Sequence, residues 1–180
     1  VESGISLCEY VILGLGGKDK SHDHVISSAR VLNEIDSDFI RVRTLTVNKQ
    51  MPLYSEVKNG NFIQATDGEI LEEERLLIEH LGCHSTYVSD HITNLLQEIE
   101  GKLPQDKEKM LASIDRFQSL SPEERTNFRI GRRVGIYTRL DDLYDLRKYQ
   151  GVERIIHRIS PGSNQVDEKI IHTLMERFIA

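Results

Sequence analysis

Short apolar runs alternate with one long amphipathic segment over the first fifty residues of the chain. Residues 9–15, EYVILGL, form a β-branched apolar run that stops at glycines, as a buried strand of a parallel sheet does. Apolar positions then recur at helical spacing over 23–36, and residues 39–47 alternate apolar with polar side chains. Strand, helix and strand within about 40 residues predict a βαβ crossover with parallel strands.

Two further elements are expected after a loop at 48–66. The segment Thr66-Asp67-Gly68-Glu69 has the spacing of a capping box, which predicts a helix that ends near Gly82. Residues 86–88 are β-formers and predict a third short strand.

From residue 92 onward the apolar pattern is helical. Apolar residues recur at helical spacing over 92–99 and stop at Gly101. Ser121, Pro122 and Glu124 have the spacing of an N-cap, a first helical proline and the glutamate of a capping box, which predicts the start of a further helix. Further helices are expected over 104–117, 140–148, 152–158 and 166–178, the last ending with Phe178. The fold prediction is α/β, with the strands in a domain over 1–90 and a helical C-terminal domain over 91–180.

Charge and cysteine content narrow the classes of partner. The 23 basic and 29 acidic residues give a net charge of −6, so nucleic acid is not an expected partner. No apolar run approaches the roughly 20 residues of a membrane helix. The chain begins with neither Met nor a signal sequence, so we expect a start inside a longer gene. Cys8 and Cys83 stand alone, which predicts two reduced thiols in a cytoplasmic protein.

The run Gly14-Leu15-Gly16-Gly17 is a candidate binding loop. It follows the first predicted strand, and sheets and barrels present their ligand loops at the carboxyl ends of strands. Glycine also lets the backbone approach a ligand closely. The complete GxGxxG or GxxxxGK[ST] pattern is lacking, so a tight strand-to-helix turn is the simpler interpretation.

Two other groups of residues carry candidate chemistry. Asp90 and His91 follow the third strand, where Asp90 either orients His91 for acid-base work or caps a helix that begins at Ile92. Arg132 and Arg133 follow a glycine and form either a clamp for a carboxylate or phosphate, or surface ion pairs. No set of residues has the spacing of metal ligands, so no metal site is predicted.

Five strings of residues, in this order and spacing, carry a resemblance to a known family. They are EYVILGLGG, DFIRVRTLTV, PLY, SDHITNLLQEIEGKLPQDKEKML and FRIGRRVGIY, within residues 5–143. Together they resemble the distal part of a family of radical S-adenosylmethionine (SAM) iron-sulfur oxidoreductases related to the oxygen-independent coproporphyrinogen oxidases. The family's glycine-rich turn is GLPG-like, whereas Gly17 stands here without a proline.

The resemblance implies a fold and a set of cofactor contacts. The strand at 9–15 would be the fifth, and that at 39–47 the sixth, of a partial TIM-like (βα) barrel. SAM would lie across the carboxyl ends of these strands, near Leu13, Gly14, Gly16, Gly17, Arg43, Thr44 and Leu45. A [4Fe-4S] cluster would cleave SAM to a 5′-deoxyadenosyl radical that abstracts hydrogen from a small-molecule substrate, with Asp90 and His91 nearest to that substrate.

One departure limits what the chain can do alone. The family holds its cluster with a CxxxCxxC loop, and two isolated cysteines cannot replace it. We therefore expect a C-terminal fragment of the oxidoreductase that binds no cofactor and is inactive alone, with its substrate left open. The alternatives are a binding module for an anion or nucleotide at the glycine turn, and a helical module that forms homodimers through residues 92–99.

Overall fold

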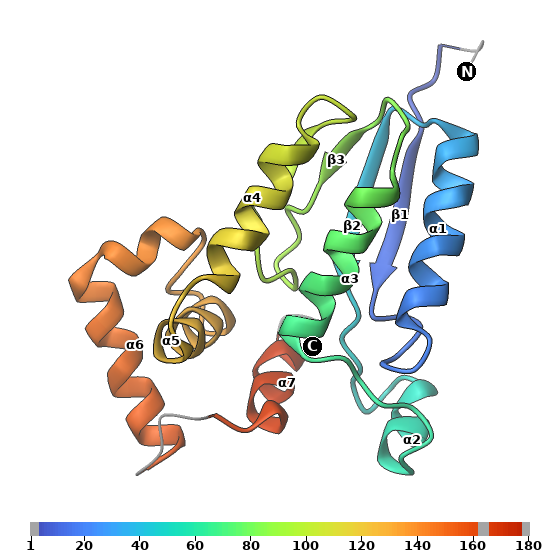
Figure 1. Ribbon diagram of the computed structural model, residues 1–180. Helices are drawn as coiled ribbons and strands as arrows, with labels where there is room; N and C mark the ends of the chain where they lie inside the picture. Colours follow the sequence, from blue (N-terminus) through green and yellow to red (C-terminus); the bar gives the residue numbers. More distant parts are fainter. Residues whose placement is uncertain (1–3, 162–165, 178–180) are drawn as a thin grey trace. The chain divides into compact units, whose positions relative to one another are not determined.

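The computed structural model describes residues 4–161 and 166–177 (Figure 1). The chain divides into two compact units, residues 1–114 and residues 115–180. The first contains β1 (Cys8–Leu13), α1 (Ser21–Ile35), β2 (Phe39–Thr44), α2 (Leu53–Lys58), α3 (Asp67–His80), β3 (Thr86–Val88), β4 (Glu100–Lys102) and the start of α4 (Lys107–Gln118). The second contains the end of α4, then α5 (Pro122–Arg133), the 3-10 helix η1 (Leu140–Tyr144), α6 (Leu146–Ile159) and α7 (Glu168–Glu176).

The strands form one mixed sheet in the order β1-β2-β3-β4. β1, β2 and β3 are parallel, and β4 pairs antiparallel with β3. The predicted β1-α1-β2 crossover and the α/β class are therefore confirmed. The units divide later than the boundary expected at residue 90, because the chain beyond that residue returns to the sheet as β4.

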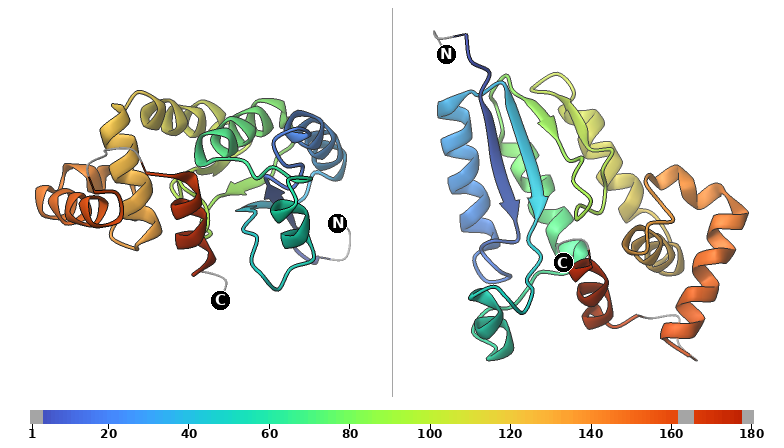
Figure 2. Two further views of the ribbon diagram at one scale, coloured as in Figure 1. Left: turned by 90° about the horizontal axis from the view of Figure 1, so that it is seen from below. Right: turned by 180° about the vertical axis from the view of Figure 1, so that it is seen from behind.

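Helices α1 and α3 pack against each other and cover one face of the strands (Figure 1). Seen from behind, β1 and β2 have no helix of the first unit in front of them (Figure 2). Side chains that point toward the helices are buried and alternate with more exposed ones. We call the other side the open face; it carries Cys8, Tyr10, Ile12, Phe39, Arg41 and Arg43.

The helix predicted over 92–99 is wrong: this segment is irregular and leads into β4. Leu95, Leu96 and Ile99 are all buried, so the apolar spacing was a correct signal of burial. Their periodicity does not become a helix because Asn94, in the same segment, is bonded to the neighbouring strand β2.

The Asn94 side chain replaces a piece of strand at the edge of β2. β3 pairs with β2 only as far as Arg41, which leaves later backbone groups of β2 without a strand partner on that side. Asn94 Oδ1 accepts hydrogen bonds from the Thr44 backbone N–H (2.8 Å) and hydroxyl (3.1 Å), and Asn94 Nδ2 donates to Val42 O (2.9 Å). The carboxamide, 1% exposed, therefore satisfies the backbone as a peptide group would.

The second unit has its own aromatic core. Phe128 lies between Phe117 and Tyr137, with ring centroids 5.9 and 5.8 Å away. The capping box predicted at Ser121 is present, with its partner Glu124. The two short helices expected over 140–158 are η1 and a continuous α6. The end of the last predicted helix at Phe178 lies outside the described residues.

No helix in the described ranges combines the length and the apolar character that crossing a membrane requires.

The first prediction concerns Asn94. Asn94→Ala leaves a buried N–H and a buried carbonyl of β2 without partners, so we expect a loss of about 2–3 kcal/mol in the free energy of unfolding. Chemical denaturation measures it. Asn61→Ala is the control, because Asn61 is exposed and its Nδ2 bonds only the exposed Glu56; it should cost under about 0.5 kcal/mol. Equal losses in the two variants would contradict the role given to Asn94.

Candidate functional site

The glycine turn after β1 is shaped by packing. Gly14 has φ +82°, and a Cβ there would lie 2.6 Å from the Ile70 Cδ1 atom of α3. Gly17 also has positive φ, +62°. Other residues strain in this region, so both positions need glycine for the backbone alone. The interpretation of a tight strand-to-helix turn explains these glycines.

A buried carboxylate, Glu73 of α3, organises this turn from inside the protein. Glu73 Oε1 accepts a hydrogen bond from Gly14 N–H at 2.9 Å and lies 3.0 Å from His24 Nδ1. Glu73 Oε2 accepts from the Ser21 hydroxyl at 2.5 Å. Ser21 and His24 belong to the first turn of α1, so Glu73 occupies the position at the start of this helix where an external anion would bind.

The predicted cofactor contacts lie on both sides of the sheet. Leu13 and Thr44 are buried on the helix-covered side, and the Thr44 hydroxyl is bonded to Asn94. Gly16 is packed against the turn, since a Cβ there would lie 2.7 Å from Lys20 O. Leu45, half-buried, extends β2 by donating its N–H to Leu13 O. Arg43 alone among the seven predicted contacts projects from a strand onto the open face.

An ion pair brings the Asp90-His91 segment to the open face. Arg41 Nη1 lies 3.1 Å from Asp90 Oδ2, and both side chains are about half exposed. The interpretation of Asp90 as a helix cap is wrong, because no helix follows it. Asp90 instead balances the charge of Arg41 on β2. His91, the next residue of the chain, lies near enough to Arg43 for that charge to affect its pKa.

The surroundings of His91 favour its neutral form. Its Nδ1 lies 2.7 Å from Thr93 Oγ1 and accepts a hydrogen bond from Thr93 N–H at 3.3 Å. Burial lowers the pKa of His91, the nearby positive charge of Arg43 lowers it further, and Asp90 opposes both. A neutral ring whose Nδ1 accepts carries its proton on Nε2, so His91 offers an N–H donor at neutral pH.

The open face therefore holds several polar and aromatic side chains. The guanidinium carbon of Arg43 lies 4.8 Å from the centre of the Tyr10 ring, a cation–π contact. Tyr10 and Arg41 were absent from the residues proposed from sequence. Strand alternation could have identified them. In the paired strands Tyr10, Arg41 and Arg43 occupy alternating positions that place their side chains on the same side of the sheet.

A buried polar network supports this group from the other side of the sheet. Tyr87 donates its hydroxyl to Glu74 Oε1 at 3.0 Å, and Ser89 also bonds this carboxyl. Ser89 Oγ in turn accepts from Asn94 Nδ2 at 3.0 Å. Burial raises the pKa of Glu74 to about 7, against the lowering effect of the two hydroxyls. Sequence reasoning missed Glu73 and Glu74, although both fall on the apolar face of α3 between Ile70 and Leu77.

The second prediction is a pH dependence that Glu74 imposes on stability. The folded protein binds this proton more tightly than the unfolded chain, whose carboxyl titrates near 4.5. Its contribution is therefore greatest below pH 4.5 and decreases by up to about 3 kcal/mol as the pH rises through 7. Denaturation from pH 4.5 to 8 should show this slope in the wild type and lose it in Glu74→Gln. The control Glu72→Gln, at a side chain 62% exposed, should keep the wild-type slope; parallel curves for all three proteins would contradict the assignment.

The predicted arginine pair is part of the interior of the second unit. Arg132 and Arg133 are 3% and 2% exposed, so the interpretation as surface ion pairs is wrong. Arg132 Nη1 donates to Tyr137 O at 2.9 Å. The adjacent Gly131 lies against the Tyr137 ring, where a Cβ would be 2.1 Å from Cδ2. The GRRVGIY string therefore shapes the turn after α5.

The third prediction separates two helical glycines. Gly131→Ala drives a methyl group into the Tyr137 ring, so we expect a loss of about 1–3 kcal/mol in the free energy of unfolding. Gly151→Ala, in α6 with nothing within 4 Å of the new Cβ, should instead gain about 0.5–1 kcal/mol from helix propensity. Thermal denaturation of both variants measures the difference in sign; a stabilised Gly131→Ala protein would contradict the packing argument.

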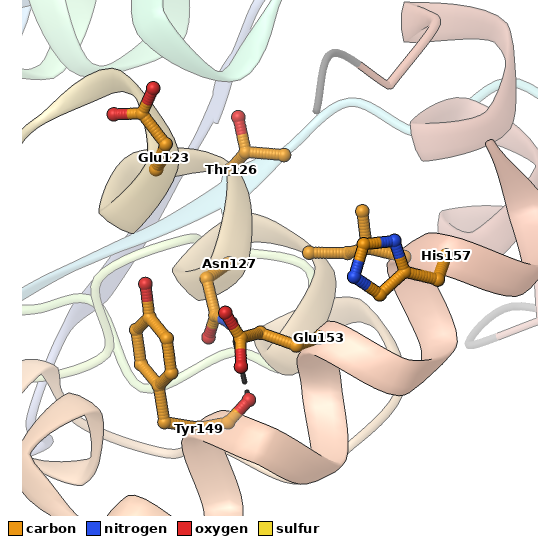
Figure 3. A pocket seen from close by; sticks show the side chains of 7 residues that line it. Glu123, Thr126, Asn127, Tyr149, Glu153 and His157 are labelled. Carbon is orange, nitrogen blue, oxygen red and sulfur yellow. Dashed lines mark hydrogen bonds between the residues drawn. The ribbon is translucent and has the colours of Figure 1, made fainter. Parts of the chain in front are cut away.

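A small acidic cavity lies between α5 and α6 of the second unit (Figure 3). Its volume is about 70 Å³, and it is lined by Glu123, Thr126, Asn127, Tyr149, Glu153, Ile156 and His157. Asn127, the buried amide at its base, is already bonded to Tyr137 OH (2.6 Å) and Tyr149 O (3.3 Å). The cavity is therefore a recess in the helix packing whose buried amide has its partners within the protein.

The cysteines do not provide a cluster site. Cys8 is exposed at the start of β1, Cys83 is buried before β3, and both are free thiols. The described residues contain no group of three or more His, Cys, Asp or Glu side chains placed to hold a metal ion. A [4Fe-4S] cluster is held by several cysteine thiolates that lie close together. The two separate cysteines of this chain do not fit such a cluster.

Comparison with known proteins found no matching family profile, curated protein or solved structure.

Proposed function

We propose that this chain is the C-terminal part of a radical SAM iron-sulfur oxidoreductase. In this proposal β1 and β2 are the fifth and sixth strands of a partial TIM-like (βα) barrel, and the second unit belongs to a helical C-terminal region. The observation that carries the proposal is the coverage of the parallel strands: α1 and α3 lie on one face, and the open face bears polar and aromatic side chains.

Coverage on one side favours a barrel over a doubly wound sheet. In an open doubly wound sheet helices cover both faces, so strand residues of both parities are buried. In a barrel helices cover only the outside, and the other parity faces the interior and the ligand. Tyr10, Arg41 and Arg43 have the parity that would face such an interior.

The two edges of the sheet are also consistent with a segment of a larger barrel. β1 is an edge strand, and its outer side is available for another parallel strand. At the opposite edge β3 adds one parallel strand beyond the proposed sixth, and the antiparallel β4 then ends the sheet. Upstream strands would therefore add next to β1.

The proposed division of work follows from the position of each residue. Arg43 and Leu45 lie at the carboxyl end of β2, where SAM would bind, while Leu13 and Thr44 would support that end from the core. Cluster ligands would come from an upstream part of the protein, where the cluster would cleave SAM for hydrogen abstraction from a small-molecule substrate. Asp90 and His91 would contact that substrate.

The two alternative functions have less support. An anion or nucleotide at the glycine turn would meet Glu73, a carboxylate already bonded to Gly14 and Ser21. Self-association through a helix at 92–99 lacks its surface, because the segment is not helical and Leu96 is fully buried. Neither alternative uses the open face.

The fourth prediction tests the proposal in the complete gene product that contains this chain. We expect three cysteines with CxxxCxxC spacing upstream of Val1, and anaerobic iron and sulfide reconstitution should yield the absorption and electron paramagnetic resonance of a [4Fe-4S] cluster. Chromatography should then detect 5′-deoxyadenosine from SAM and reductant. The 180-residue chain treated in the same way should give neither.

Variants identify the source of the thiolates. Alanine at any of the three upstream cysteines should abolish the cluster, whereas Cys8→Ser and Cys83→Ser should leave it unchanged because these thiols are single and separate. The proposal fails if the complete product lacks such a motif, takes up no iron, or leaves SAM intact.

A further inference from the structure

The open face carries two arginines of β2, of which one forms an ion pair with a carboxylate and the other contacts an aromatic ring. Arg41 is paired with Asp90 at 3.1 Å. Arg43, two residues later on the same strand, lies over the Tyr10 ring, and no carboxylate pairs with it within the described part of the chain. Its guanidinium edge is therefore available for an oxygen ligand while the ring fixes its plane.

Two neighbouring side chains, those of His91 and Tyr10, add hydrogen-bond donors. His91 uses Nδ1 to accept from Thr93, which leaves its Nε2–H available. The Tyr10 hydroxyl is on an exposed side chain of the same face. The Arg41–Asp90 ion pair holds the His91 segment at this face, and Asn94 fixes the far end of the same segment on β2.

We propose that Arg43, together with His91 and Tyr10, binds a carboxylate group of the substrate on the open face. The identification of the ligand as a substrate rests on the proposed function; the carboxylate chemistry rests on the residues themselves. Arg43, one of the predicted SAM contacts at the carboxyl end of β2, would then also hold the carboxylate of the substrate beside SAM.

Charge favours a carboxylate over a phosphate. The group offers one uncompensated positive charge, from Arg43, and two neutral donors, which balance a monoanion. A phosphate dianion would bring a second negative charge to the face that carries Asp90. Arg41 could not balance that charge, because it is already paired with Asp90. The planar fork of guanidinium also matches the two oxygens of a carboxylate.

The test uses three small probes on the 180-residue chain: propionate, its neutral isostere propionamide, and inorganic phosphate. Nuclear magnetic resonance of the Arg43 side-chain N–H and the His91 ring should show saturable shifts with propionate, and much weaker ones with propionamide and phosphate. Arg43→Gln should weaken propionate binding about tenfold or more, because it removes the charge-assisted bond. Arg43→Lys should restore part of the affinity.

A charge-matched control excludes a general electrostatic effect. Arg30→Gln removes one positive charge from the exposed side of α1 and should leave the propionate response unchanged. Backbone spectra of every variant verify that the fold is intact. Equal binding of propionate and propionamide, equal losses in Arg43→Gln and Arg30→Gln, or binding of phosphate in preference to propionate would each overturn the inference.

The source of the carboxylate is decided in the complete protein, since SAM also carries one. If the site serves the substrate, saturating propionate should leave the affinity of the wild-type protein for SAM unchanged. Competition between propionate and SAM would instead assign the carboxylate to SAM and overturn the substrate role. Two outcomes distinguish this inference from the proposed function. If the complete protein holds no cluster but the 180-residue chain binds propionate through Arg43, only the proposed function is rejected. If the complete protein cleaves SAM but Arg43→Gln does not weaken propionate binding, only this inference is rejected.

Discussion

Helices α1 and α3 bury one face of the parallel strands, and no helix of the first unit covers the open face. Successive side chains of a strand point to opposite sides of the sheet. Each of β1 and β2 therefore has one set of side chains that packs against the helices and another set on the open face. Ile40, Val42 and Leu13 supply the apolar contacts that hold the helices. Tyr10 and Arg43, of the opposite parity, are free of that packing and can meet a ligand.

Buried polar groups then determine where the loops at the carboxyl ends of the strands lie. Glu73 bonds the turn after β1 to the start of α1, Glu74 bonds the end of β3 through Ser89, and Asn94 completes the edge of β2. Each group is nearly inaccessible to water, so an unmade bond would leave a full desolvation penalty. Polar contacts on the opposite side of the sheet therefore position the loops that border the open face, together with the Arg41–Asp90 ion pair on that face.

Several residues of the strings on which the proposed relation to radical SAM oxidoreductases rests have structural roles in this chain. Gly14 is needed for its positive φ and its contact with Ile70, and Gly131 for its contact with Tyr137. Arg132 holds a backbone carbonyl in the core of the second unit. A string of this kind is compatible with more than one chemistry, because function depends on the side chains that reach the ligand.

The sequence alone determined the elements whose signals are local. Apolar alternation defined β2, and the capping boxes at Thr66 and Ser121 marked the starts of α3 and α5, because such hydrogen bonds form between residues three apart. Tertiary structure decided what depends on distant partners. The segment 92–99 has helical spacing, yet Asn94 is bonded to a strand fifty residues away. Likewise, the parity of Tyr10 and Arg43 was readable from the chain, but only the packing of α1 and α3 decided which parity stays exposed, since burial depends on the neighbours that folding brings.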